Sequence, residues 1–273
     1  MTAQDSVQND GRSEAPDAVA ALEAAGPVAS AGSDRDAWPR RQVVSFGRRD
    51  GRRQGQYARA YPPELARFVI EPPRGERSAS LADGWVFDAS AAFERDAPLI
   101  VEIGSGTGEA VLHHAAENPH LNHLAVEVYR PGASRTVAQA GVRGLQNVRV
   151  LEADAAELVG GALAPGSVAA LHVFFPDPWP KTRHHKRRLV DAWFVAQVAR
   201  ALEPGGVLRL ATDWEHYAHQ MLQVAAGCGH LRNAYPARDG GWASRYSGRP
   251  LTTFERKGLA AGRTIHDLEF VRA

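Results

Sequence analysis

Cysteine is the scarcest residue type in this 273-residue sequence, which contains a single one, Cys228. One cysteine excludes an internal disulfide and any metal site built from several cysteines, and it suits a reducing compartment such as the cytoplasm. The histidine pairs His113/His114 and His184/His185 lack the recurring carboxylate–histidine spacing of a metal site. We therefore expect no metal ion.

Long apolar segments are also missing. The opening residues MTAQDSVQND contain neither a basic stretch nor an apolar core, so we expect no secretory signal. Residues 158–176 carry no formal charge, but Pro165 and three glycines interrupt them. This pattern predicts a helix end, a turn and a buried strand rather than a membrane span. We expect a soluble, cytoplasmic protein with no membrane association, as a monomer or a homodimer.

Net charge is small as well, +1 at pH 7, but it averages two unlike regions. Residues 1–36 hold seven acidic side chains against two arginines, a net charge of −5, which leaves +6 for the remainder. Their composition, without aromatic residues or periodicity, predicts a disordered acidic tail. Residues 37–80 include RRQVVSFGRRDGRR and form a predicted basic arm, followed by a domain over 81–273. Clustered cations suit a polyanionic partner.

Strands alternate with helices from about residue 98 onward. Apolar runs ending in glycine or acidic residues predict strands, and amphipathic stretches between them predict helices, the longest over 187–206. The alternation predicts an α/β fold of Rossmann-like type, with a mostly parallel, seven-stranded sheet and helices on both faces. Functional residues should gather where the strands end. The predicted strands cover residues 98–104, 122–128, 147–154, 167–175, 206–213 and, as a closing antiparallel strand, 264–273.

A glycine-rich loop follows the first strand of this pattern. Its glycines, Gly104, Gly106 and Gly108, would let the backbone approach a ligand at a helix N-terminus. The dinucleotide fingerprint would need a glycine at Glu109. The acid before the loop, Glu102, would repel a pyrophosphate but attract a sulfonium. The loop therefore favours S-adenosylmethionine over a nicotinamide cofactor.

Two further acids stand at the ends of the next two strands. Glu127 lies about 20 residues past the loop, where an acid commonly binds ribose hydroxyls. Asp154 is placed to accept a hydrogen bond from an adenine amine. Each acid alone would be an ordinary helix N-cap, but acids at three successive strand ends indicate a site. This is the pattern of a Rossmann-like methyltransferase.

The fourth strand runs into Pro176-Asp177-Pro178-Trp179, which places Asp177 at the mouth of the same pocket. The prolines restrict the backbone and lower the entropy lost in holding the carboxylate. A dense run of cations follows. A plain turn with a core tryptophan is the alternative interpretation, and the position opposite the glycine loop argues against it.

Taken together, VEIGSGTGE, LAVEV, EADA, FFPDPWPKTRHHKRR, GGVLRLATDWEHYAHQML and RPLTTFERKG resemble the bacterial tRNA (guanine-N7-)-methyltransferase family, over roughly residues 40–273. The resemblance implies a class I methyltransferase that transfers methyl from S-adenosylmethionine to N7 of the variable-loop guanosine at tRNA position 46. It implies a cofactor side lined by Glu102, Gly104, Gly106, Gly108, Glu127, Asp154 and Asp177. It implies contacts to the target nucleoside from Lys181, Asp213, Thr252, Thr253, Phe254 and Glu255, and contacts to RNA from Arg183, His184, His185, Lys186, Arg187 and Arg188. Thr253 departs from the family, where lysine is common.

This chemistry suits the residue types. Guanine N7 already carries an in-plane lone pair, so the reaction needs alignment and stabilisation of a cationic purine rather than a base. Asp177 is the candidate catalytic residue, since it could accept from guanine N–H groups and offset the developing charge. The alternatives are a methyltransferase acting on an exocyclic nucleobase amine and an RNA-binding module with a vestigial cofactor fold.

Overall fold

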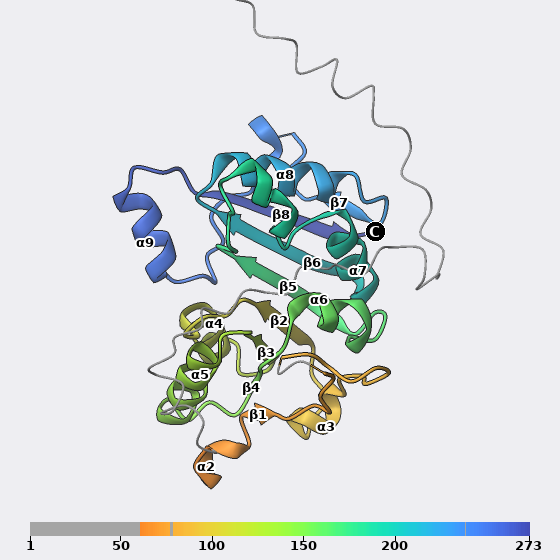
Figure 1. The fold of residues 1–273 in the computed structure, drawn as a ribbon, viewed down its shortest axis with the longest axis vertical. Coiled ribbons are helices and arrows are strands. Elements are labelled where there is room, and N and C mark those ends of the chain that lie inside the picture. The colour runs from red at the N-terminus through yellow and green to blue at the C-terminus, as the bar shows by residue number, and fades with distance from the viewer. Residues whose placement is uncertain (1–60, 77–78, 238) are drawn as a thin grey trace, which may run out of the picture. The chain divides into compact units, whose positions relative to one another are not determined.

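The computed structural model describes residues 61–76, 79–237 and 239–273, so the acidic tail and the arginines of the arm up to residue 60 lie outside the described residues. The described residues form one sheet with the strand order β1-β4-β3-β2-β5-β6-β8-β7, shown in Figure 1. The strands are β1 (Val69–Ile70), β2 (Leu99–Ile103), β3 (Asn122–Val126), β4 (Val148–Leu151), β5 (Val168–Phe174), β6 (Leu202–Thr212), β7 (Leu231–Asn233) and β8 (His266–Arg272).

The predicted α/β architecture is confirmed. The five strands expected to be parallel are β2 to β6, and the closing strand β8 pairs antiparallel with β6. The sheet has eight strands rather than seven. The six strands placed from the sequence correspond to β2 to β6 and β8, and the structure adds β7, which pairs with β8, and the short β1, which pairs with β4 with Val69 opposite Val150. Phe68, directly before β1, is fully buried. Residues 68–70 therefore belong to the folded sheet, although the sequence pattern assigned them to the basic arm.

The helices are α2 (Pro63–Ala66), α3 (Ala89–Phe93), α4 (Glu109–Glu117), α5 (Arg130–Val142), α6 (Ala155–Glu157), α7 (Ala192–Ala201), α8 (Glu215–Ala226) and α9 (Thr253–Ala260). The helix predicted over 187–206 is shorter than expected. Asp191 caps α7 by accepting a hydrogen bond from Phe194 N at 2.8 Å, and Leu202 already begins β6. No helix among residues 61–76, 79–237 and 239–273 is long and apolar enough to cross a membrane.

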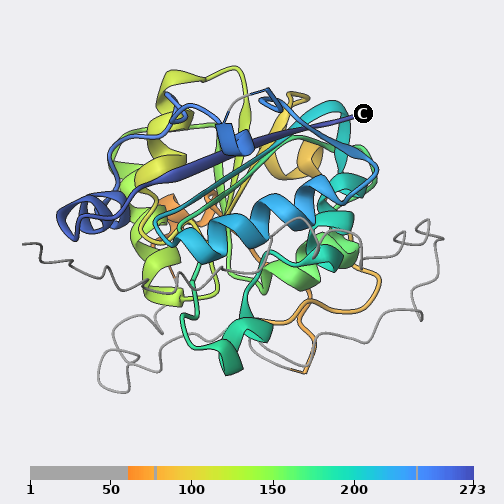
Figure 2. The same cartoon turned by 90° about the horizontal axis from the view of Figure 1, so that it is seen from above.

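Two apolar cores cover the two faces of the sheet. Along β3, Leu124 and Val126 belong to the core that includes α7 and α8, whereas Ala125 belongs to the core that includes α4 and α5. Because successive strand residues point to opposite faces, α7 and α8 cover the face opposite to α4 and α5 (Figure 1 and Figure 2). The carboxyl ends of β2 to β6 share one edge, and the site lies there.

Candidate active site

The glycine loop between β2 and α4 needs backbone conformations that side chains disfavour. Gly104, Gly106 and Gly108 have φ angles of 72°, 56° and 83°, in the left-handed region that glycine enters without strain. A Cβ on Gly104 or Gly106 would meet no atom within 4 Å, whereas one on Gly108 would lie 2.8 Å from Thr136. The loop therefore presents its backbone to open space on one side and packs tightly on α5 on the other.

Glu127, beyond the end of β3, holds this loop. Its Oε2 accepts from Gly106 N at 2.8 Å and its Oε1 from Tyr129 N at 2.7 Å. Burial raises the pKa of Glu127, hydrogen bonds from backbone N–H groups oppose that rise, and the charge of Asp177 adds to it. The folded chain thus brings Asp177 and Glu127, 50 positions apart in the sequence, to one edge of the sheet.

The other two predicted acids are also buried. Glu102 is 5% exposed within β2, and burial raises its pKa to about 8, against the opposing effects of a Val111 hydrogen bond and the Arg249 charge. A cationic ligand nearby would favour its charged form. Asp154 caps α6 by accepting from Ala156 N at 2.9 Å, so its N-cap role is real and coexists with its place at the strand end.

The loop around Asp177 is strained. Phe175 and Trp179, on either side of it, have φ angles of 52° and 43°, values that non-glycine residues rarely adopt. Phe175 N donates to Ala211 O at 2.7 Å, which ties the loop to β6. Backbone strain of this kind persists where the surroundings enforce it and is concentrated at functional sites. Asp177 itself is exposed between the two strained residues.

Arg188, predicted to contact RNA, is 3% exposed and lies inside the protein. Its Nε donates to Pro178 O at 2.9 Å, and its Nη1 lies 2.6 Å from Gln220 Oε1 and 3.0 Å from His216 Nδ1. The guanidinium also lies over the Tyr217 ring. Arg188 therefore supports the Asp177 loop, because it supplies the hydrogen-bond donor that the inward-facing carbonyl of Pro178 needs.

The rest of the basic run forms a single 3₁₀ helix, Thr182–Arg187. Lys181, Arg183 and Lys186 are exposed, while Arg187 lies over the Trp179 ring, its Cζ 5.0 Å from the ring centroid. Partial burial, followed by the surrounding cations, lowers the pKa of both His184 and His185. The lowered pKa values favour the neutral form of both histidines, so the positive charge of this helix comes mainly from Arg183, Lys186 and Arg187.

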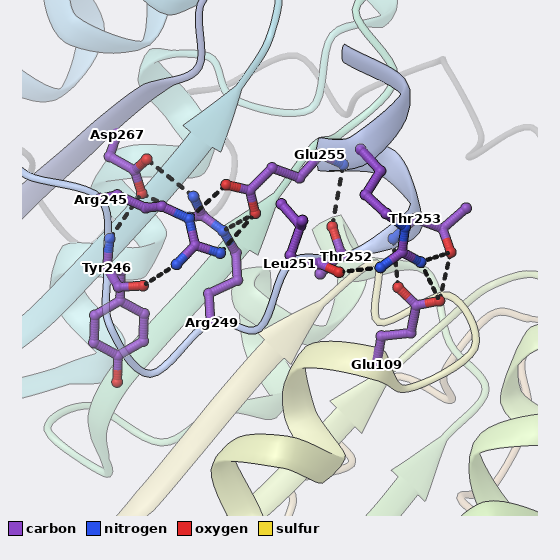
Figure 3. Close-up of polar contacts among 10 residues, drawn as sticks. Glu109, Arg245, Tyr246, Arg249, Leu251, Thr252, Thr253, Glu255 and Asp267 are labelled. Atoms are coloured by element: carbon purple, nitrogen blue, oxygen red, sulfur yellow. Dashed lines mark hydrogen bonds and ion pairs between the residues drawn. The ribbon is translucent and has the colours of Figure 1, made fainter. Parts of the chain in front are cut away.

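The segment Thr252–Glu255 is held from two sides (Figure 3). Thr252 caps α9 by accepting from Glu255 N at 3.2 Å. Thr253 donates through its N to Glu109 Oε2 at 2.5 Å and through its Oγ1 to Glu109 Oε1 at 2.6 Å, which joins α9 to the first residue of α4. Phe254 is 59% exposed, whereas Glu255 is 1% exposed. Only part of the segment is open to a substrate.

A buried ion network fixes the other end of this segment. The Arg249 side chain is fully buried and bonds Asp267 through both terminal nitrogens, at 2.6 and 2.9 Å, and Glu255 through Nε at 3.2 Å. Arg245 forms a second pair with Glu255 at 2.6 Å. Burial alone would raise the pKa of Glu255, but hydrogen bonds from both arginines bring it below its usual value. Sequence reasoning missed Arg249, whose only signal was its place within RPLTTFE.

A buried histidine chain begins at Tyr246, which lies between Arg245 and Arg249 in the sequence. Tyr246 Oη and His114 Nε2 are 2.7 Å apart, and His114 Nδ1 and His123 Nε2 are 2.8 Å apart. His172 packs edge-on against the His114 ring. Burial is the largest of the effects that lower the pKa of all three histidines, that of His123 to about 3. They do not form a metal site, since no three His, Cys, Asp or Glu side chains of the described residues are grouped to hold an ion.

Acid should weaken the fold through these histidines. A group with a depressed pKa in the folded state contributes stability above its unfolded pKa, about 6.5 for histidine, and loses it as the pH falls. The difference in free energy of unfolding between the unaltered chain and His123→Gln should shrink by about 2 kcal/mol from pH 7 to pH 5. The pKa of Glu102 is raised rather than lowered, but Glu102 is present in both proteins, so its contribution cancels in this difference. Urea unfolding at both pH values measures it.

His120→Gln is the control for this prediction, because His120 is exposed. Its difference from the unaltered chain should not change between pH 7 and pH 5. A pH-independent difference for His123→Gln would show that His123 is not held neutral in the folded state.

These features define a class of protein. A glycine-rich loop after β2, acids near the ends of β2, β3 and β4, and a sheet that ends in the antiparallel set β6-β8-β7 are features of a class I methyltransferase. A family model described as a putative methyltransferase matches residues 96–268.

Proteins named tRNA (guanine-N(7)-)-methyltransferase are similar over most of the chain. That of Arthrobacter sp. (strain FB24) is 42% identical over 84% of this chain and 86% of its own, and that of Nocardioides sp. (strain ATCC BAA-499 / JS614) is 44% identical over 85% and 88%. The chain belongs to the tRNA (guanine-N7-)-methyltransferase family. The solved 16S rRNA methyltransferase KamB is 18% identical, with a TM-score of 0.48 over 75% of this chain and 100% of its own, so the assignment rests on the sequence relatives.

Proposed function

We propose that this chain methylates N7 of the variable-loop guanosine at position 46 of tRNA, in the cytoplasm, with S-adenosylmethionine as the methyl donor. The observation that supports this most directly is the convergence of Asp177, on a strained loop, with the glycine loop and Glu127 at one edge of the sheet. Family membership supports tRNA guanine N7 as the target, because relatives 39–44% identical to this chain are named tRNA (guanine-N(7)-)-methyltransferase.

The residues at the glycine loop fit the proposed cofactor. The loop leaves open space at Gly104 and Gly106, and Ser105 Oγ is a buried polar atom without a hydrogen-bond partner among the residues that the structure describes. Buried carboxylates suit a ligand with a cationic centre and with hydroxyl and amine donors. When bound, S-adenosylmethionine would supply an activated methyl group. The carboxylates that would hold it are Glu102, Glu127 and Asp154, with Asp177 at the mouth.

Asp177 is proposed to position the target guanine and to offset the positive charge that forms on the purine. Its loop is held in place by Arg188 and by β6, so little reorganisation is needed as the charge develops. No proton has to be removed from guanine N7. Lys181, Asp213 and the exposed Phe254 are proposed to contact the nucleoside, whereas Thr252 and Glu255 are proposed to act by fixing the segment that carries Phe254 and Thr253.

Methyl transfer onto an unmodified tRNA transcript, followed by nucleoside analysis, tests the proposal. The expected product is N7-methylguanosine, and a transcript with adenosine at position 46 should accept no methyl group there. Methyl on an exocyclic nitrogen would support the alternative methyltransferase instead. Binding of tRNA without any transfer of labelled methyl would support a non-catalytic RNA-binding module.

The exposed cations of the 3₁₀ helix should bind tRNA phosphates. Replacing Arg183 and Lys186 together with Ala is expected to weaken tRNA binding uniformly and to reduce the slope of log affinity against log salt by about two, roughly one per lost phosphate contact. Fluorescence anisotropy with labelled tRNA over a salt series measures both effects. Arg188 is left unchanged, because its removal would destabilise the Asp177 loop.

A matched pair, Arg143→Ala with Arg232→Ala, removes two exposed cations from the opposite edge of the sheet, at the C-terminus of α5 and the start of β7. This control should keep the salt slope of the unaltered chain. Equal slopes for both double variants would refute the assignment of the 3₁₀ helix to phosphate binding.

A further inference from the structure

Asp213, the carboxylate proposed to bind the target guanine, is already engaged by a side chain of the same protein. Arg263 Nη1 donates to Asp213 Oδ2 at 2.6 Å, although the two residues are 50 positions apart. The same guanidinium lies over Trp214, its Cζ 4.8 Å from the ring centroid. Asp213 follows β6, and Arg263 lies between α9 and β8. A planar cation thus sits on a carboxylate and an indole at the edge of the sheet where the site lies.

A guanidinium and a guanine base offer similar surfaces to such a pair. Both are planar, both present neighbouring N–H donors that match a carboxylate, and both stack on an aromatic ring. In guanine the donors are N1–H and the N2 amino group. We infer that Arg263 occupies the place of the target guanine on Asp213 and Trp214, and that it has to leave when tRNA binds. This inference rests on the proposed function.

The surroundings allow this exchange. The Asp213 side chain is 13% exposed and the Arg263 side chain 41% exposed, so Arg263 can turn outward without disturbing the core. On another side, α9 closes the site, since a Cβ on Gly258 would lie 2.9 Å from the Asp213 carboxylate. The partly exposed Arg263 guanidinium covers Asp213 on the side of Trp214.

In this exchange Asp213 discriminates between the bases, and Arg263 sets how strongly a base must pair with Asp213 to bind. A guanine that displaces Arg263 replaces its charge-assisted hydrogen bond to Asp213 with bonds from its own N1–H and N2 donors. Adenine presents the N1 lone pair in place of the N1–H of guanine, so it would leave the carboxylate incompletely paired. Leaving a largely buried acceptor unsatisfied is costly. Displacing Arg263 costs the same for either base, so only a base that pairs fully with Asp213 offsets that cost.

Arg263→Ala tests the inference in the full chain. The KM for tRNA is expected to fall by roughly two- to fivefold, the range of a partly exposed ion pair, with kcat nearly unchanged. Guanidinium chloride at a low, non-denaturing concentration should bind Asp213 at the position vacated by the Arg263 side chain and raise the KM of the variant. Sodium chloride at the same ionic strength should raise it less. The unaltered chain should respond equally to the two salts.

Two further variants keep the test decisive. Arg263→Gln keeps most of the side-chain length without the charge and should behave like Arg263→Ala, even if the alanine variant folds poorly. Arg232→Ala, which removes an exposed cation from β7, should leave the KM and the guanidinium response unchanged.

The opposite result would overturn the inference. A higher KM with a smaller salt slope in Arg263→Ala would identify Arg263 as a phosphate ligand, and an unchanged KM would show that it does not compete. If either result is obtained while the unaltered chain still forms N7-methylguanosine, the inference about Arg263 is refuted but the proposed function is not. Absence of that product from the unaltered chain would refute the proposed function and the base site together.

Discussion

Asp177→Ala is expected to lower kcat for methyl transfer to tRNA by about 10²–10³-fold, the usual cost of losing one preorganised group that stabilises transition-state charge. The backbone on both sides of Asp177 is fixed, with strained φ angles at Phe175 and Trp179, so we expect the carboxylate to need little reorganisation as the purine becomes cationic. The affinity for S-adenosylmethionine should change far less, because Glu102, Glu127 and Asp154 remain. Single-turnover kinetics with labelled methyl donor, and calorimetry for cofactor binding, measure the two effects.

Asp177→Asn separates the two ways in which the carboxylate can act. The amide keeps a hydrogen-bond acceptor for a guanine N–H that does not bind Asp213, but it removes the negative charge. A rate close to that of Asp177→Ala would assign the effect to charge, and a rate close to that of the unaltered chain would assign it to hydrogen bonding. An unchanged kcat in Asp177→Ala would contradict any catalytic role for this residue.

Arg249→Met is expected to reduce the free energy of unfolding by about 3–5 kcal/mol, the typical cost of removing one partner of a buried ion pair. The Arg249 side chain is fully buried, and its loss leaves Asp267 and part of Glu255 without a counter-charge. Methionine fills similar volume, so most of the loss reflects unpaired charge rather than a cavity. Urea unfolding at pH 7 measures the difference.

Arg245→Met is the matched control, since its guanidinium pairs with the same Glu255 but is 41% exposed. Its loss should cost no more than about 1 kcal/mol. Combining Arg249→Met with Glu255→Gln and Asp267→Asn should recover part of the stability by removing the stranded charges. Equal decreases in the free energy of unfolding for Arg249→Met and Arg245→Met would show that the burial of Arg249 does not make its ion pairs more important for stability.

The Arg249 network also matters for the site. It fixes Glu255, and Glu109 fixes Thr253, so the segment carrying Phe254 is anchored from the sheet and from α4 (Figure 3). The exposed Phe254 is therefore presented by a rigid support. The family's common lysine is replaced here by Thr253, whose hydroxyl and backbone N–H both donate to the Glu109 carboxylate.

Sequence patterns were sufficient to predict the sheet and the position of the site. Strands β2 (LIVEI) and β5 (VAALHVF) are nearly continuous apolar runs, because both faces of the sheet are covered and a strand buried on both faces lacks the usual alternation of apolar and polar residues. The acids at strand ends could be placed together because parallel strands bring their carboxyl ends to one edge. The two-residue strand β1 escaped prediction, since Val69 and Ile70 are too few to show a period.

By itself, then, the sequence determined the α/β class, the glycine loop, the acids around it and the proline turn that carries Asp177, because these depend on local periodicity and turn chemistry. Only the tertiary structure decided which arginines face outward. Arg188 and Arg249 are buried and Arg263 binds Asp213, with partners up to 50 residues away. A cation in a basic run shows no local sign of its partner. The role of such an arginine depends on which carbonyl or carboxylate the fold leaves within its reach. Burying that acceptor without a hydrogen-bond donor would cost more free energy than ordering the arginine side chain.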